Sequence, residues 1–239
     1  MVPIIKKEWQ QYFSGMLGYL TIIVFLLISG LVVFIIPESG ILDTGYATMD
    51  PFFSIAPYIM LFLIPAVTMK SFSEEYKTGT FEVLRTAPVS VRNLVLGKFM
   101  AGVLVVTLAL VCTLVYVLCI ALLSTGGIDS GGIAGSYIGL LCLCSVYTAI
   151  GIFTSSLQQN AVTAFLLSAL ICFAAYSLFS SLAGVSALGN TLGYWISMAG
   201  IAVHYEHMSK GYIDSRDLIY FLTVIIFFLQ LTIMQVKNR

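Results

Sequence analysis

Residues 17–36 read LGYLTIIVFLLISGLVVFII, a stretch of twenty residues without a charged side chain. An α-helix rises about 1.5 Å per residue, so a helix of this length crosses the roughly 30 Å hydrocarbon core of a bilayer. In the whole chain of 239 residues, 59% are hydrophobic and only 9% are charged. In soluble domains, about 45–50% of the residues are hydrophobic and about 25% are charged. The sequence therefore predicts an all-α integral membrane protein with a single transmembrane domain over residues 1–239.

Five further stretches are predicted to cross the membrane: residues 55–69, 99–123, 136–156, 161–182 and 218–236. The first of these is short and contains Pro57 and Pro65, but it lies in a charge-free window that begins at Pro51. It is predicted to be a kinked span, because neighbouring helices can satisfy the carbonyls that a proline frees. Residues 186–203 are apolar but interrupted by Gly, Asn, Thr and Ser. They predict either a seventh span or a pair of short helices dipping into the outer leaflet.

The distribution of Lys and Arg predicts the orientation, because cytoplasmic loops carry an excess of both. With six spans, nine of these residues fall on the cytoplasmic side and two on the other, and both termini are cytoplasmic. A seven-span topology gives nine against two as well, so charge alone does not decide the number. Six spans are favoured because residues 186–203 make a poor span.

Residues 1–16 are predicted to form an interfacial helix. A lipid-facing stripe of apolar residues lies opposite Lys6, Lys7 and Gln10, a pattern that suits a helix lying in the membrane surface. The members of the stripe are Ile4, Ile5, Trp9, Tyr12 and Phe13.

The longest charged stretch, residues 70–98, joins the second span to the third. Ser71 and Glu74 have the spacing of a capping box that opens a short helix, and Gly79 allows a sharp bend. Residues 80–87 can form two helical turns with Phe81 and Leu84 on one face, ended by Pro88, and Ser90 can cap the next helix. The segment is either an ordinary charged loop or a docking surface for a cytoplasmic partner.

Residues 183–217 form a predicted outer segment that contains both histidines. Asp214 is expected to cap the last span, and Arg216 to bridge to Glu206 or Asp217. His204 and His207 have a spacing that can serve a metal, but two histidines alone are weak evidence, and no metal site is expected. The predicted outer structural cluster is His204, Glu206, Gly211, Asp214, Arg216 and Asp217.

Several kinds of site are not expected. The sequence has no phosphate-binding loop, since Leu96-Gly97-Lys98-Phe99 lacks the required pattern. The predicted spans contain no charged residue, which argues against an ion-coupled secondary transporter. The five cysteines all lie in apolar stretches, where small thiols pack between helices. Neither catalytic residues nor a nucleic-acid partner are expected.

The charged stretch also resembles a known family. SFSEEYKTGTFEVLRTAP, residues 71–88, followed by Gly97-Lys98, is similar to the permease subunits of ABC type 2 transporters. Arg85-Thr86-Ala87-Pro88 departs mildly from the usual Leu-Thr-x-Pro. Residues 205–221, 37–43 and 128–131 resemble a narrower branch, the gliding-motility-associated permeases of the bacterial inner membrane.

The resemblance implies a six-helix permease of the type V exporter kind, with a cytoplasmic coupling helix and outer re-entrant helices, so residues 186–203 would not span. It implies a cytoplasmic ABC ATPase dimer that binds ATP and Mg, a second permease protomer, and a membrane subunit with a periplasmic domain, all embedded in lipid. No cofactor is expected in this chain. The alternative is a scaffold or mechanotransmitter that moves a periplasmic partner without transporting anything. The residues implied in ATPase coupling are Glu74, Glu75, Gly79, Thr80, Glu82, Leu84 and Pro88.

Overall fold

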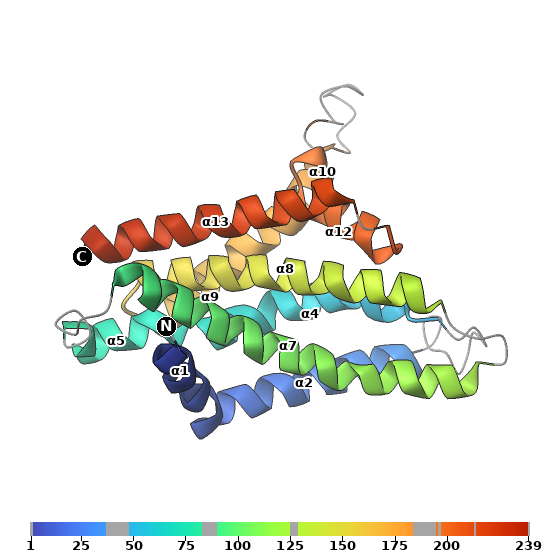
Figure 1. Cartoon of the computed structure of the whole chain (residues 1–239), viewed down its shortest axis with the longest axis horizontal. Coiled ribbons are helices and arrows are strands. Elements are labelled where there is room, and N and C mark those ends of the chain that lie inside the picture. Colours follow the sequence, from blue (N-terminus) through green and yellow to red (C-terminus); the bar gives the residue numbers. More distant parts are fainter. Residues whose placement is uncertain are drawn as a thin grey trace.

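Long helices lie side by side along the molecule in the computed structural model (Figure 1). The structure describes residues 2–36, 48–82, 90–124, 129–183, 195, 197–212 and 214–238. The helices are α1 (Val2–Ser14), α2 (Met16–Phe34), α4 (Asp50–Thr68), α5 (Lys70–Thr78), α7 (Val91–Leu123), α8 (Ser130–Leu157), α9 (Ala161–Phe173), the π-helix η1 (Ala174–Leu178), α10 (Phe179–Ala183), α12 (Ile201–Ser209) and α13 (Ser215–Asn238).

Within the described residues, five continuous helices are long and apolar enough to cross a membrane: Asp50–Thr78, Val91–Leu123, Ser130–Leu157, Ala161–Leu182 and Ser215–Asn238. The pair Val2–Ser14 and Gly18–Phe34, whose axes differ by 66°, brings the number to six if it is counted as one span. The prediction of an all-α membrane protein is thus confirmed for the described residues, with five or six candidate spans. Several helices extend beyond the predicted spans. Helix α7, for example, begins at Val91, whereas the span was predicted to begin at Phe99.

Helix α8 occupies the centre of the bundle and packs against α4, α7, α9, α12 and α13. Its glycines allow the close approach that small residues provide between membrane helices. A Cβ atom built on Gly139 would lie 2.7 Å from the Cβ of Met208 in α12. A Cβ on Gly102 of α7 would lie 2.8 Å from a methyl group of Thr148 in α8. Among the five candidate spans of the described residues, α8 is the most buried.

Helices α4 and α5 form one nearly continuous rod. Met69, the residue between them, keeps helical dihedral angles, with φ −54° and ψ −33°. The predicted capping box is therefore wrong: no side chain caps α5, and the Ser71 hydroxyl instead hydrogen-bonds to the Tyr12 hydroxyl of α1 at 3.3 Å. Gly79 ends α5 with a left-handed φ of +72°, as the bend predicted there requires. Ser90 caps α7 as predicted, accepting a hydrogen bond from the Asn93 amide.

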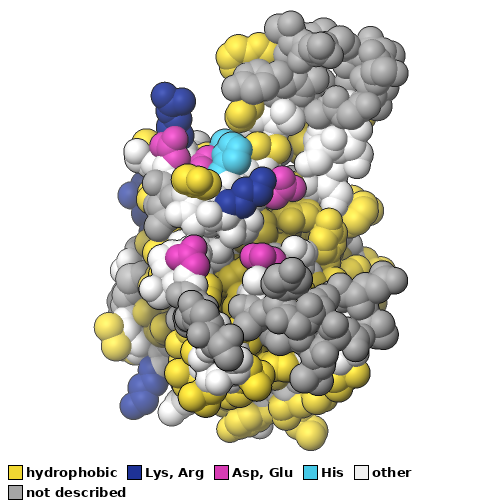
Figure 2. All heavy atoms as spheres, turned by 90° about the vertical axis from the view of Figure 1, so that its right-hand side faces the viewer, with side chains coloured by type: hydrophobic (Ala, Val, Ile, Leu, Met, Phe, Trp, Pro, Cys, Tyr) yellow, Lys and Arg dark blue, Asp and Glu magenta, His cyan; other side chains and the backbone are white. Residues whose placement is uncertain are grey.

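At the opposite end of the bundle, α12 packs back on α8. Its nine residues give a length of only about 14 Å, too short to cross a bilayer. The Ser136 hydroxyl of α8 donates to the carbonyl of Ser209 at 2.7 Å, which fixes the end of α12. Residues 184–194 and 196, which contain most of the ambiguous stretch, lie outside the described residues. Figure 2 shows this end face on, with acidic, basic and histidine side chains gathered near its centre.

Candidate functional site

A buried group of charged side chains joins three helices at the end of the bundle that contains α5. The Lys98 ammonium of α7 donates three hydrogen bonds: to the Ser71 carbonyl at 2.6 Å, to Glu75 Oε1 at 2.8 Å and to Glu8 Oε1 at 2.9 Å. The Lys98 side chain is only 1% exposed. We call Lys98, Glu8, Glu75 and Ser71 the Lys98 cluster. Because an ammonium has three donors and no acceptor, the cluster satisfies Lys98 completely.

The neighbouring residue Gly97 explains how α1 comes close enough to take part. A Cβ atom on Gly97 would lie 2.8 Å from the Cγ2 of Ile4, so only glycine leaves room for α1 at this distance. Ile4, Glu8 and Tyr12 are spaced four residues apart, so they lie on one face of α1. That face packs against the protein, with Glu8 3% and Tyr12 8% exposed. The stripe that was predicted to face lipid packs partly on protein. Tyr12, Ile5, Trp9 and Phe13 pack against α4 and α7, and Ile4 packs against α7.

The charges of the cluster balance only when a further charged residue, Lys7, is included. Two carboxylates face one ammonium, and Lys7 supplies the second positive charge, 3.4 Å from Glu75 and 3.8 Å from Glu8. The ring of Phe72 lies 4.9 Å from the Lys98 nitrogen, close enough for a cation–π contact. Removing one member of a buried ion pair typically costs about 3–5 kcal/mol, because the other charge stays buried without a partner. The cluster therefore fixes α1, α5 and α7 to one another.

Tyr12 extends this contact towards the start of α5. Its hydroxyl bonds to that of Ser71, and burial raises the pKa of the phenol well above its usual range. The phenol therefore stays protonated, and its hydroxyl can donate a hydrogen bond to the Ser71 hydroxyl or accept one from it.

The structure separates the residues that the sequence assigned to ATPase coupling. Glu75 lies inside the Lys98 cluster, whereas Glu74 is half-buried one position away. Gly79, Thr80 and Glu82 are exposed beyond the end of α5, where the Thr80 hydroxyl bonds to that of Thr78 at 3.0 Å. The remaining two, Leu84 and Pro88, lie outside the described residues.

Sequence reasoning missed Glu8 and did not single out Lys98. Lys98 was quoted in a rejected phosphate-binding loop and in the Gly-Lys pair of the family resemblance, but with no role of its own. Glu8 carried a usable signal, since it lies between two apolar residues of one helical face at a spacing of four. The pairing itself joins residues 90 positions apart, and no local pattern reports such a contact.

The outer cluster at the α12 end is built differently from the prediction. Asp214 caps α13 as expected, accepting from the Arg216 amide at 3.0 Å. The Arg216 side chain is exposed, and no ion pair joins it to Glu206, Asp217 or any other described residue. The acid instead pairs with histidine: His204 Nδ1 lies 2.6 Å from Asp217 Oδ1.

The second ring nitrogen of His204 is also engaged. Nε2 lies 2.9 Å from the carbonyl of Met198, and the ring of Tyr220 stacks at 4.0 Å between centroids. His207 is about half exposed and lies 3.8 Å from the second oxygen of Asp217. Gly211 has a φ of +83° and contacts Gly132 of α8. The segment is thus fixed onto α13 through Asp217, and Arg216 was the wrong partner because its side chain points to the surface.

The comparison with known families agrees with this architecture. The family described as ABC-2 family transporter protein matches residues 2–235, nearly the whole chain. The chain belongs to this family. No curated protein matches the chain.

Membership of this family establishes the general role of this ABC-2 permease. It is a multi-pass membrane subunit of an ABC transporter, and permeases of this family are generally not the ATPase. The family implies an ABC ATPase as partner. The match covers α1, α5 and α7, so the whole Lys98 cluster lies within the family domain.

Proposed function

We propose that the chain transmits the movement of separate ATPase subunits to its membrane spans through the helices that the Lys98 cluster joins. The observation that carries this proposal is the rod formed by α4 and α5. It extends from the transmembrane bundle to Gly79, and the cluster holds its end against α1 and α7. A push on the tip of α5 would be passed to three helices at once, as in other rigid-body transitions.

The tip of α5 and the residues beyond it are the proposed docking surface. Thr80 and Glu82 are exposed there, whereas Glu75 is buried. Glu82 would therefore face the ATPase partner, and Glu75 would hold the coupling segment in place. Leu84 and Pro88 remain proposed members of this surface on the strength of the family pattern alone.

The wider assembly follows the resemblance of the sequence. We infer a six-span permease of the bacterial inner membrane with both termini cytoplasmic, so that the α5 end faces the cytoplasm. Two such protomers would join an ATPase dimer that binds ATP and Mg, and a membrane subunit with a periplasmic domain. Gliding motility is the process we propose for this complex, and the chain itself is proposed to need no cofactor.

Charge reversal at the docking surface tests the proposal. Glu82→Lys should reduce copurification of the ATPase and leave the thermal stability of the permease unchanged, because Glu82 is exposed. Glu206→Lys, an equally drastic change at an exposed residue of the α12 end, is the control and should copurify normally. If Glu82→Lys retains the ATPase with full ATP hydrolysis, the surface does not couple.

A further inference from the structure

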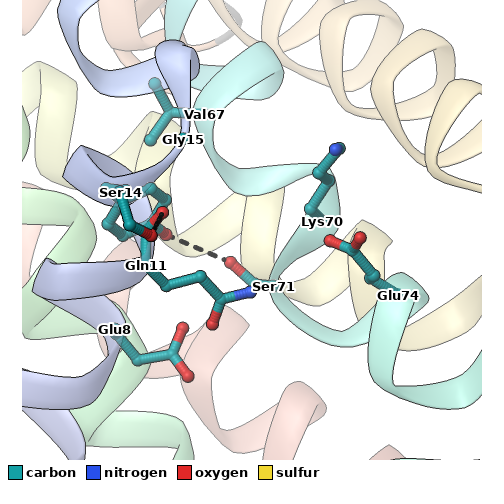
Figure 3. A pocket seen from close by; sticks show the side chains of 9 residues that line it. Glu8, Gln11, Ser14, Gly15, Val67, Lys70, Ser71 and Glu74 are labelled. Carbon is teal, nitrogen blue, oxygen red and sulfur yellow. Dashed lines mark hydrogen bonds between the residues drawn. The ribbon is translucent and has the colours of Figure 1, made fainter. Parts of the chain in front are cut away.

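A cavity of about 270 Å³ opens between α1 and the junction of α4 with α5. Figure 3 shows its two walls, with Gln11 and Ser14 on the α1 side and Lys70 and Glu74 on the other. Glu8, Tyr12, Gly15, Val67 and Ser71 complete the lining. The lining thus combines one ammonium, two carboxylates, neutral polar groups and the aliphatic side chain of Val67.

Two of these charged side chains have no partner in the described part of the chain. Lys70 and Glu74 are one helical turn apart on the same face, and both are half-buried. Neither side chain makes an ion pair with the other or with another described residue. Glu8 is different, because its carboxylate is already held by Lys98 at 2.9 Å. A separated cation and anion at the wall of one cavity match a ligand that carries both charges.

Exposed apolar side chains lie close in sequence to both walls of the cavity. Phe62, Ala66, Lys70 and Glu74 follow one another at a spacing of four, so they form one ridge along α4 and α5. Phe62 is 59% exposed on a transmembrane helix. On the other wall, Gly15 is followed directly by Met16, 84% exposed at the start of α2. A molecule in the cavity with an apolar tail could therefore extend that tail along exposed apolar side chains.

We propose that this cavity binds the headgroup of an ethanolamine phospholipid. Lys70 would bind the phosphate and Glu74 the primary ammonium, with Gln11 and Ser14 as further hydrogen-bonding groups. The Glu74 carboxylate disfavours a headgroup that is only anionic, such as phosphatidylglycerol, whereas the charge of Glu8 is already balanced by Lys98. A choline headgroup fits less well, because a quaternary ammonium cannot donate hydrogen bonds to Glu74. Glu74 also belongs to the segment that the resemblance assigns to ATPase coupling, but the cavity lies between α5 and α1, whereas the proposed docking surface is the exposed tip of α5 and the residues beyond it. The lipid proposal does not rest on coupling.

Binding to the purified full chain tests the proposal. Native mass spectrometry would measure the occupancy of phosphatidylethanolamine, phosphatidylcholine and phosphatidylglycerol with identical acyl chains. We expect the ethanolamine lipid to bind best. Glu74→Gln should lower its affinity about tenfold, the usual worth of one charge-assisted hydrogen bond, to the level of phosphatidylcholine. Lys70→Gln should weaken all three lipids, because all three carry the phosphate.

Matched variants keep the result interpretable. Glu82→Gln and Lys77→Gln remove the same charges from exposed residues outside the cavity and should leave the lipid preference unchanged. Glu74→Asp, which keeps the charge, should retain part of the preference and guards against a folding defect in Glu74→Gln. Equal binding of the three lipids by the unmodified chain would overturn the proposal. So would a loss of preference in Glu82→Gln as large as that in Glu74→Gln.

Discussion

Replacing Lys98 by Met should destabilise this permease more than any other single change at the α5 end. Methionine fills a similar volume without the charge, so the variant leaves Glu8 and Glu75 facing each other in a buried site. These carboxylates are 3% and 8% exposed, and their Oε1 atoms lie within 2.9 Å of the same lysine nitrogen.

The size of the effect follows from these contacts. The loss of one member of a buried ion pair costs about 3–5 kcal/mol. Here one lysine serves two acids and a backbone carbonyl, while Lys7 remains nearby on the exposed side. We expect about 3 kcal/mol or more, expressed as a lower melting temperature of the detergent-purified chain. The triple variant Lys98→Met, Glu8→Gln and Glu75→Gln should recover much of this loss, because it removes the unpaired charges together.

Thermal unfolding, monitored by intrinsic fluorescence or light scattering, measures the stability lost in the single variant and the stability recovered in the triple variant. Lys77→Met provides the control, since Lys77 is an exposed lysine of α5 and its loss should change stability by less than about 0.5 kcal/mol. The reasoning fails if Lys98→Met melts with the control, or if the triple variant melts below the single one. Either result would mean that the cluster does not hold the three helices together.

Three further predictions concern packing and topology. Gly97→Ala places a Cβ atom 2.8 Å from a methyl group of α1 and should cost about 1–3 kcal/mol by overpacking, measured as a lower melting temperature; an unchanged value would show that α1 does not pack there. His204→Ala should lower stability by about 1–3 kcal/mol, because it leaves a buried acid without its 2.6 Å hydrogen-bond partner, whereas Arg216→Ala should change stability by less than about 0.5 kcal/mol; the reverse order would contradict the observed pairing. A cysteine at Lys210 should react with an impermeant thiol reagent from outside and one at Lys237 only after the membrane is opened, whereas the opposite labelling would establish a seven-span topology.

Features set by local sequence were predictable, and features set by distant contacts were not. The apolar stretches gave the spans because length and hydropathy act within one helix. Ser90 and Asp214 were recognised as caps because a cap bonds within three residues. The supposed cap at Ser71 failed for the same reason: Tyr12, 59 residues away, takes its hydroxyl.

The two charge clusters show the same limit. Sequence reasoning paired Arg216 with a nearby acid, since opposite charges close in sequence are the simplest partners. In the structure Asp217 faces inward and meets His204, while Arg216 points to the surface. At the α5 end, Glu8 pairs with a lysine 90 residues away, a contact that only the tertiary structure reveals.

If the chain has the proposed coupling function, the hydrogen bonds of the Lys98 cluster limit how a movement of the α5 tip can be transmitted to the spans. Apolar side chains can slide past one another at modest cost, but a shift of one residue along α5 moves its atoms by about 1.5 Å. Such a shift would break hydrogen bonds of 2.6–2.9 Å whose partners are all buried. The three helices should therefore move as one body. The joints must then lie at the ends of that body: at Gly79, where α5 ends in a left-handed residue, and between α1 and α2, whose axes differ by 66°. A movement delivered at Gly79 would in this way tilt α4 and α7 together and bend the chain where α1 meets the first span.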